Sequence, residues 1–299
     1  MSSRLPPWLR RTKQDLARLH EMKRKLRGQG LHTVCEEARC PNIGECFGRT
    51  TATFLIMGPV CSRHCGFCNV AAGHPAPLDP EEPYHVAQAA KDLGLRHVVI
   101  TSVTRDDLPL GGAGHFVETI LAVRETLPAA TIEVLTPDFQ ADETALVAIA
   151  QAPIQVFNHN VETVARLYPT ARPQADYRRS LFVLKCLAAL RPDILVKSGF
   201  MLGLGETDAE VVELLADLRA HRVNALTIGQ YLRPRLANLP VERYVPPEEF
   251  AAWEDRAKNA GFAHVAAGPL VRSSYQADRF LADETRPLAL RSESDIQND

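Results

Sequence analysis

Short apolar runs alternate with longer amphipathic stretches along most of this chain. Six runs have the length and composition of buried strands: 53–57, 97–102, 131–135, 154–157, 194–197 and 225–228. Helical patterns lie between them, as in Val211–Leu218, where apolar side chains recur every three or four residues. Repeated strand–helix alternation predicts parallel strands joined by right-handed crossovers.

Six strand–helix units are too few to close an eight-unit barrel, so we expect a partial (β/α)6 TIM-type barrel. A doubly wound open sheet is the alternative, although no Gly-x-Gly-x-x-Gly pattern follows the first strand. The core should span residues 51–235, with an N-terminal extension over 1–50 and a C-terminal extension over 236–299. Polar residues that follow barrel strands line the carboxyl-terminal mouth, which is therefore the candidate site.

Charge and hydropathy exclude several classes of protein. The 299 residues include 34 Lys or Arg and 36 Asp or Glu, which gives a formal net charge of -2. This balance disfavours nucleic-acid binding, which normally requires a strongly basic domain. No apolar stretch reaches the roughly 18 residues that cross a bilayer, and the N-terminus lacks the apolar block of a secretory signal. We expect a cytoplasmic protein that binds neither nucleic acid nor membrane.

The N-terminal arm is basic. Residues 1–28 contain nine Arg or Lys against Asp15 and Glu21. Three interpretations remain open: a mitochondrial transit peptide, a solvated basic helix, and a docking surface for an acidic carrier protein.

The seven cysteines are unevenly distributed. Six lie between Cys35 and Cys68, and only Cys186 stands apart, in an apolar helical stretch where we expect a buried small hydrophobe. A reducing compartment does not favour a disulfide framework, so metal or redox chemistry is the better explanation for the six.

The first triplet follows the first strand and reads Cys61-Ser-Arg-His-Cys65-Gly-Phe-Cys68. Three thiolates can hold a 4Fe–4S cluster while leaving one iron open for another ligand. The alternative is a structural zinc site with His64 or His74 as the fourth ligand.

The second triplet, Cys35, Cys40 and Cys46, precedes the predicted barrel. Pro41 and Gly44 oppose a plain helix, so the thiols can turn inward from an irregular loop. Buried structural cysteines are the alternative, but the charged neighbours in this stretch do not suit core packing. We therefore expect a second cluster here.

The CxxxCxxC spacing with Phe67 before the third cysteine resembles the radical S-adenosylmethionine superfamily. The resemblance implies that the open iron is chelated by the amino and carboxylate groups of the cofactor. An electron from the cluster then cleaves the cofactor to methionine and a 5′-deoxyadenosyl radical, which abstracts unactivated hydrogens. The segment Gly199–Glu206 resembles the GxIxGxxE segment of this superfamily, with Met201 where isoleucine is commonest.

Two stretches, Gly30–Ala38 and Cys40–Cys46, look like the signature of the lipoyl synthase family. The similarity extends over residues 30–278, through further stretches at 99–103, 105–108, 135–139, 157–160, 201–206, 229–232 and 268–275. Some positions depart from the family pattern, namely Gly66, Leu110 and Gln276. None of the three is an expected cluster ligand.

This resemblance implies an activity and two clusters. Cys61, Cys65 and Cys68 would hold the cluster that binds S-adenosylmethionine. The auxiliary 4Fe–4S cluster would be held by Cys35, Cys40, Cys46 and Ser274, with Ser273 as the less favoured serine. Two cofactor molecules would be consumed while sulfur from the auxiliary cluster is inserted at carbons 6 and 8 of an octanoyl-lysine.

Further residues are predicted to contact the nucleoside cofactor, mostly from their positions at strand ends. They are Phe67, Thr101, Ser102, Asn158, Lys197, Met201, Gly203 and Gln230.

The implied partners are octanoylated lipoyl carrier proteins, such as E2 subunits of 2-oxoacid dehydrogenases and the glycine cleavage H-protein. An electron donor such as flavodoxin or ferredoxin and an iron–sulfur carrier for cluster rebuilding are also implied. Two other sulfur-inserting enzymes, a methylthiotransferase and a biotin synthase, are the nearest rivals, and a non-catalytic zinc-binding module is the rival from another class.

Overall fold

The computed structural model describes residues 5–10, 24, 28, 31–37, 42 and 53–274, and only the backbone of Cys35. The expected ligands Cys40 and Cys46 and the departure at Gln276 lie outside the described residues. Among the described residues, no helix has both the length and the apolar character needed to cross a membrane.

An eight-stranded sheet forms the centre of the molecule, in the order β1-β2-β5-β6-β7-β8-β9-β10. All its neighbouring pairs are parallel except β1 with β2, which is antiparallel. The strands are β1 (His32–Thr33), β2 (Thr53–Ile56), β5 (His97–Ser102), β6 (Thr131–Leu135), β7 (Val156–Asn158), β8 (Leu195–Leu202), β9 (Ala225–Gln230) and β10 (His264–Gly268). A small second sheet pairs β3 (Val60–Cys61) with β4 (Ala71–Ala72).

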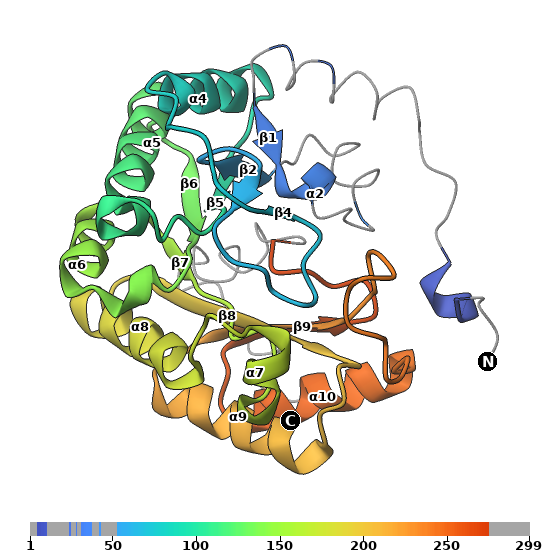
Figure 1. Ribbon diagram of the computed structural model, residues 1–299. Coiled ribbons are helices and arrows are strands. Elements are labelled where there is room, and N and C mark those ends of the chain that lie inside the picture. The colour runs from blue at the N-terminus through green and yellow to red at the C-terminus, as the bar shows by residue number, and fades with distance from the viewer. Residues whose placement is uncertain are drawn as a thin grey trace.

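The longer helices connect successive strands and cover the outer face of the sheet (Figure 1). They are α4 (Glu82–Asp92), α5 (Ala113–Thr126), α6 (Glu143–Gln151), α8 (Tyr177–Leu190), α9 (Asp208–Ala220) and α10 (Pro247–Asn259). The short elements are η1 (Pro7–Leu9), α2 (Val34–Glu37), η2 (Pro109–Gly112), η3 (Phe139–Ala141), η4 (Ala165–Leu167) and α7 (Tyr168–Ala171). Polar caps begin several of the long helices: Asp142 on α6, Asp176 on α8 and Thr207 on α9 each accept a backbone hydrogen bond.

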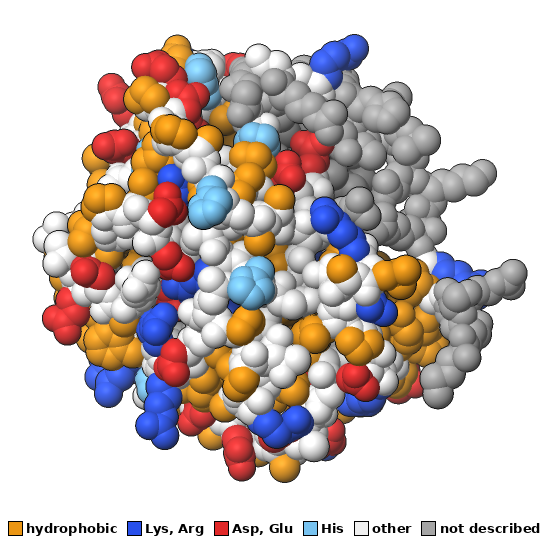
Figure 2. Space-filling view, viewed as in Figure 1, with side chains coloured by type: hydrophobic (Ala, Val, Ile, Leu, Met, Phe, Trp, Pro, Cys, Tyr) orange, Lys and Arg blue, Asp and Glu red, His pale blue; other side chains and the backbone are white. Residues whose placement is uncertain are grey.

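The main core lies between the sheet and the outer helices. Phe54, Ile100 and Val134 point into it from neighbouring strands and are fully buried. Side chains alternate along a strand, so the intervening residues face the inside of the curved sheet. There Val156, Leu195 and Ala225 form a small separate apolar cluster. Figure 2 shows basic and acidic side chains interspersed over the described part of this face of the molecule.

The expected partial barrel is confirmed as a mainly parallel sheet that does not close. The strands follow one another in sequence order without the reversal that a doubly wound sheet requires. Several strand ends differ from the expectation. β8 extends to Leu202 rather than stopping at Lys197, β9 extends to Gln230 rather than stopping at Ile228, and β7 lies one to two residues later than expected. The sheet also continues beyond residue 235, because β10 pairs with β9 in parallel.

Candidate active site

The first cysteine triplet lies on a loop at the carboxyl-terminal edge of β2. Met57 and Gly58 turn the chain there, with φ angles of 67° and 83°. The base of the loop is closed where β3 pairs with β4 and where the Gly73 amide donates to the Cys61 carbonyl at 2.9 Å. Cys61, Cys65 and Cys68 therefore come from one fold-back loop at the mouth of the partial barrel.

Arg63, inside this loop, fixes it to two other strand-end loops. Its guanidinium donates to both carboxylate oxygens of Asp106 at 2.6 and 2.8 Å and to both of Asp138 at 2.9 and 2.7 Å. Burial alone would raise the pKa of Asp138, but the hydrogen bonds and charge of Arg63 hold it far below its usual range. The loop is thus tied to the segments that follow β5 and β6.

The sulfur atoms receive backbone hydrogen bonds. The amides of Arg63 and Thr104 lie 3.4 and 3.3 Å from Cys61 Sγ, and the Val70 amide lies 3.4 Å from Cys68 Sγ. Burial raises the pKa of Cys65, and it raises the pKa of Cys68 to about 12. A bound cation, such as iron, opposes this effect of burial because it stabilises the thiolate form.

The donor set fits an iron–sulfur cluster. Cys61 and Cys65 lie near enough to Cys68 to raise its pKa further, so the three thiols are neighbours on this loop. Within the described part of the chain, no three His, Cys, Asp or Glu side chains are placed to hold one metal ion. A cluster takes its thiolate ligands at separate irons, which is the arrangement that three cysteines of one loop can supply.

Two side-chain amides bring the second cysteine segment to the same region. Asn69, next to Cys68, donates to the carbonyl of Glu37 in α2 at 2.5 Å. Asn42, which lies between Cys40 and Cys46 in the sequence, donates to the Leu270 carbonyl at 2.7 Å. The second bond spans 228 residues and joins the N-terminal motif to the segment just before Ser273 and Ser274.

The two serines of the C-terminal motif contact different parts of the fold. Ser274 Oγ accepts a hydrogen bond from Thr53 Oγ1 on β2 at 2.8 Å, and Ser273 Oγ accepts one from the Asn160 amide at 2.5 Å. The chain reaches this position by passing close over Gly229, where a Cβ atom would lie 2.3 Å from the Val271 carbonyl oxygen.

Comparison with known proteins decides the family. A profile described as the radical SAM superfamily matches residues 55–218, and one described as the N-terminal domain of lipoyl synthase matches residues 1–40. The chain is 55% identical to the lipoyl synthase of Rubrobacter xylanophilus, over 94% of this chain and 88% of that protein. The lipoyl synthases of Thiobacillus denitrificans and Caldanaerobacter subterraneus subsp. tengcongensis are 56% and 55% identical, over 92% and 93% of this chain and 89% and 97% of those proteins.

The chain belongs to the lipoyl synthase family. This membership implies a 4Fe–4S cluster and S-adenosylmethionine, as in the radical SAM superfamily at large.

Solved structures show the same fold at low sequence identity. Streptococcus suis SuiB bound to S-adenosylmethionine matches with a TM-score of 0.58 and 12% identity, over 75% of this chain and 53% of that one. This chain thus spans about half the length of SuiB. Methylornithine synthase (PylB) matches with a TM-score of 0.55 and 15% identity, over 85% and 78% of the two chains.

Two expected cofactor contacts and two further residues carry buried oxygen atoms without a hydrogen-bond partner. The expected contacts are Ser102, through Oγ, and Asn158, through Oδ1, and the further atoms are Thr136 Oγ1 and Asn160 Oδ1. All four residues lie at or just beyond the carboxyl ends of β5, β6 and β7. Buried polar atoms are normally hydrogen-bonded, so these four unpaired oxygen atoms are consistent with a polar ligand that binds at the mouth. Thr101 differs, because its hydroxyl already donates to the Leu135 carbonyl at 2.8 Å.

Other expected contacts are engaged within the protein. Lys197 is fully buried and pairs with Glu133 at 3.0 Å, and Asn158 also donates to Glu133. Burial would raise the pKa of Glu133, but Lys197 and then His97 lower it to about 2. The ammonium of Lys197 is therefore bound to the barrel interior below the mouth.

The glycine-rich segment forms a tight turn after β8. Gly203 has a φ of 100°, and a Cβ there would lie 2.3 Å from the Gln230 amide nitrogen. Glu206 closes the turn by accepting from the amides of Gly203 and Leu204 at 2.6 and 2.9 Å. The Gln230 amide nitrogen donates only to backbone carbonyls, so Gln230 supports this turn. Met201 is half-buried on β8 immediately before the turn, and Phe67 is half-buried on the cluster loop.

Glu162 and Arg172 were not predicted from the sequence. Burial raises the pKa of Glu162, which Arg172 partly opposes, and the nearby charge of Arg172 also lowers the pKa of Cys65. The Arg172 guanidinium donates to the Asn160 carbonyl at 3.0 Å, while its Nε is buried without a partner. Glu162 could have been found, because it closely follows β7, whereas nothing near Arg172 in the sequence signals its position.

Two minor expectations can also be compared with the structure. Gly66, which departs from the family pattern, has little space for a side chain. A Cβ there would lie 3.0 Å from Leu239 Cγ and 3.2 Å from the Thr170 carbonyl oxygen. Cys186 packs against the core as expected but is only half-buried.

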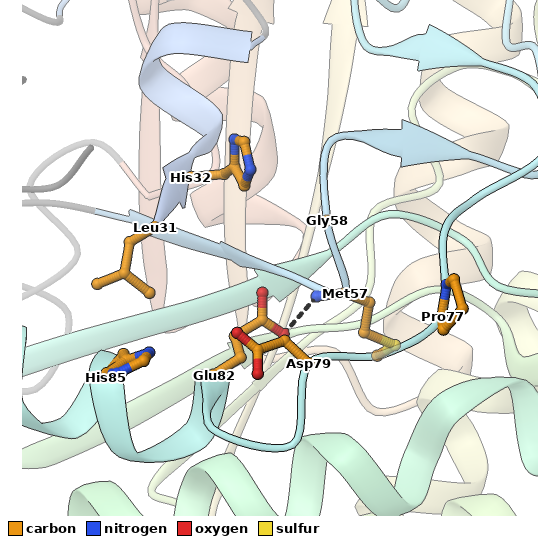
Figure 3. A pocket seen from close by; sticks show the side chains of 8 residues that line it. All are labelled: Leu31, His32, Met57, Gly58, Pro77, Asp79, Glu82 and His85. Carbon is orange, nitrogen blue, oxygen red and sulfur yellow. Dashed lines mark hydrogen bonds between the residues drawn. The ribbon is translucent and has the colours of Figure 1, made fainter. Parts of the chain in front are cut away.

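A separate cavity of about 130 Å³ lies beside the turn after β2 (Figure 3). Its lining includes His32, Met57, Asp79 and Glu82. Glu82 accepts from the Met57 amide at 2.8 Å and lies 2.7 Å from His115 Nε2, so its carboxylate is already engaged. None of the expected cluster ligands or cofactor contacts lines this cavity.

Proposed function

We propose that this chain inserts two sulfur atoms, at carbons 6 and 8, into an octanoyl chain carried on a lysine of a lipoyl carrier domain, giving the lipoyl cofactor. A saturated alkyl chain offers no acidic proton and no electrophilic carbon, so acid–base and nucleophilic catalysis have nothing to act upon. A radical route is the remaining one, and membership in the lipoyl synthase family supports it.

Cys61, Cys65 and Cys68 would hold the cluster that binds S-adenosylmethionine. When bound, the cluster and cofactor together supply a 5′-deoxyadenosyl radical. The protein contributes a fixed loop: Arg63 anchors it, and backbone amides donate to the sulfurs of Cys61 and Cys68. The orphaned oxygens at the ends of β5 to β7 would orient the nucleoside, and Glu162 and Arg172 are added to the expected contacts.

Cys35, Cys40, Cys46 and Ser274 would hold the auxiliary cluster as the sulfur source. The hydrogen bond from Asn42 to the Leu270 carbonyl carries this assignment, because it brings a residue between Cys40 and Cys46 to the segment before Ser274. Serine oxygen is a hard ligand for iron beside thiolates, which suits a cluster that must come apart.

The proposed partners follow from this chemistry. Octanoylated E2 subunits or glycine cleavage H-protein would supply the substrate, flavodoxin or ferredoxin the electron, and an iron–sulfur carrier the replacement cluster. We place the reaction in the cytoplasm, because a reducing compartment keeps cysteines out of disulfides and so available as cluster ligands.

One experiment tests the proposal directly. Anaerobic iron and sulfide quantification should give about eight irons per chain, as two cubane clusters require. Mass spectrometry of an octanoylated carrier peptide, incubated with cofactor and reductant, should then show the mass of the lipoyl group. One zinc with no iron would support the zinc-binding module instead. Two clusters without this product would point to a methylthiotransferase-like reaction.

A further inference from the structure

The loop of residues 231–240, directly after β9, carries an unusual surface. It reads Tyr231-Leu-Arg-Pro-Arg-Leu-Ala-Asn-Leu-Pro240 and contains no Asp or Glu. Leu236 is 87% exposed, the most exposed large apolar side chain among the described residues. Arg233 and Arg235 are exposed on either side of it in the sequence. A single exposed leucine is normal on a protein surface, but a leucine flanked by two arginines combines an apolar contact with positive charge.

The two arginines differ from two exposed arginines of the chain that pair with carboxylates. Arg166 pairs with Glu210 at 2.6 Å and Arg243 pairs with Glu249 at 2.6 Å, so their charges are neutralised locally. Arg233 donates only to the carbonyls of Arg235 and Leu236, and Arg235 donates to the carbonyl of Asn69, in the hydrogen bonds found for the described residues. Carbonyl contacts fix the position of a guanidinium without cancelling its charge.

The loop is also held rigidly against the cluster loop. The Asn238 amide donates to the carbonyls of Gly66 and Cys68 at 3.1 and 2.8 Å, and the Leu239 amide donates to Gly66 at 3.0 Å. The Tyr231 hydroxyl donates to the Leu239 carbonyl at 2.8 Å, which closes the loop on itself. A protein bound to this surface would therefore have a fixed position relative to the first cysteine triplet.

We propose that the 231–240 loop is the docking surface for the protein that carries the acylated lysine. The partner would present acidic side chains to Arg233 and Arg235 and an apolar contact to Leu236. This inference rests on the proposed function, because only a substrate carried on a protein needs such a surface. Docking beside the mouth lets the acylated lysine enter the partial barrel while the carrier stays outside.

The test compares two substrates with one pair of substitutions. Arg233→Glu with Leu236→Asp should raise the KM for an octanoylated carrier domain by about tenfold or more, since reversing an interface charge adds repulsion. The KM for a short, uncharged octanoyl-lysyl peptide should stay unchanged, as should kcat, iron content and cofactor cleavage. Arg96→Glu is the matched control, because Arg96 is exposed before β5 at the opposite end of the barrel. It should leave both KM values unchanged.

Salt dependence gives a second readout. The wild-type KM for the carrier domain should rise with added sodium chloride, and this dependence should flatten in Arg233→Glu. Equal effects of the paired substitution on carrier and peptide would overturn the proposal, because the loop would then serve the reaction itself. An unchanged carrier KM would also overturn it. If the wild type converts neither substrate, the proposed function fails, which this design separates from failure of the docking surface.

Discussion

Arg63 lies inside the first cysteine motif, yet its side chain serves two distant carboxylates. Asp138 is fully buried, so without Arg63 its carboxylate would keep the longer contact to Arg179 at 3.3 Å and the hydrogen bond from the Gln140 amide at 3.1 Å. Breaking one side of a buried ion pair costs about 3–5 kcal/mol. We therefore expect Arg63→Ala to lower the free energy of unfolding at neutral pH by about this amount, measured by urea denaturation. Arg63→Lys keeps the positive charge but lacks the planar guanidinium that binds both carboxylates. Its free energy of unfolding should therefore fall less than that of Arg63→Ala.

The same ion pair predicts a pH dependence. Because the pKa of Asp138 is lowered in the folded protein, its contribution to stability is full above the unfolded pKa, about 4, and is lost as pH falls below it. The wild-type free energy of unfolding should therefore fall as pH drops from about 5 to about 3, and it should fall less in Arg63→Ala. Parallel pH profiles for the two proteins would contradict this account.

The two cysteine triplets should be separable by single substitutions. Cys68→Ala should abolish cleavage of S-adenosylmethionine, because the first cluster loses a ligand. Cys40→Ala should retain cleavage but form no lipoyl product, because only the sulfur source is affected. Chromatography of 5′-deoxyadenosine and mass spectrometry of the carrier peptide measure the two outcomes. Loss of cleavage in both variants, with folding intact by circular dichroism, would reject the division of labour.

At the scale of elements, β9 requires a residue without a side chain at position 229, because the C-terminal motif passes close to its inner face there. Gly229→Ala would place a Cβ 2.3 Å from the Val271 carbonyl oxygen, so the segment leading to Ser274 must shift. We expect iron content to fall from about eight to about four per chain, with cofactor cleavage retained. Gly114→Ala is the control, because nothing lies within 4 Å of its added Cβ. Equal iron contents in the two variants would refute the role of this crossing.

Strands were largely predictable from the sequence, because short apolar runs that alternate with helical patterns indicate the buried strands of a parallel sheet. The bounds of β5 and β6 match the expectation, while β1 has only two residues and β10 is built from small residues that give no strong apolar signal. Position alone also gives no information about the partners of a strand-end residue. Lys197 lies at an expected strand end, as the other expected mouth residues do. Its partner Glu133 lies within an apolar run of the sequence, and the direction of its side chain into the barrel is known only once the strands are paired.

At the scale of the whole molecule, side-chain hydrogen bonds join segments that lie far apart in the sequence. Residues 42 and 270 meet through one amide, and Thr53 meets Ser274 across 221 residues. Motif spacing could predict which residues act together, but the contacts that join them have no local sequence signal, since each pairs a side chain with a distant partner. This is why the sequence offers candidate ligands but gives no signal for the contacts of Asn42, Asn69 and Thr53.

The hydrogen bond between Thr53 and Ser274 allows a test of whether the Ser274 oxygen acts as an iron ligand or as a hydrogen-bond acceptor. Ser274→Ala removes the expected iron ligand, so iron content should fall toward about four per chain and product should be lost. Thr53→Val keeps nearly the same shape and removes only the hydroxyl that donates to Ser274 Oγ, which leaves that oxygen available to iron. Its iron content should remain about eight. If Thr53→Val lost the same iron as Ser274→Ala, the hydrogen bond rather than iron ligation would be the function of Ser274. Full product yield from Ser274→Ala would exclude Ser274 as a ligand altogether.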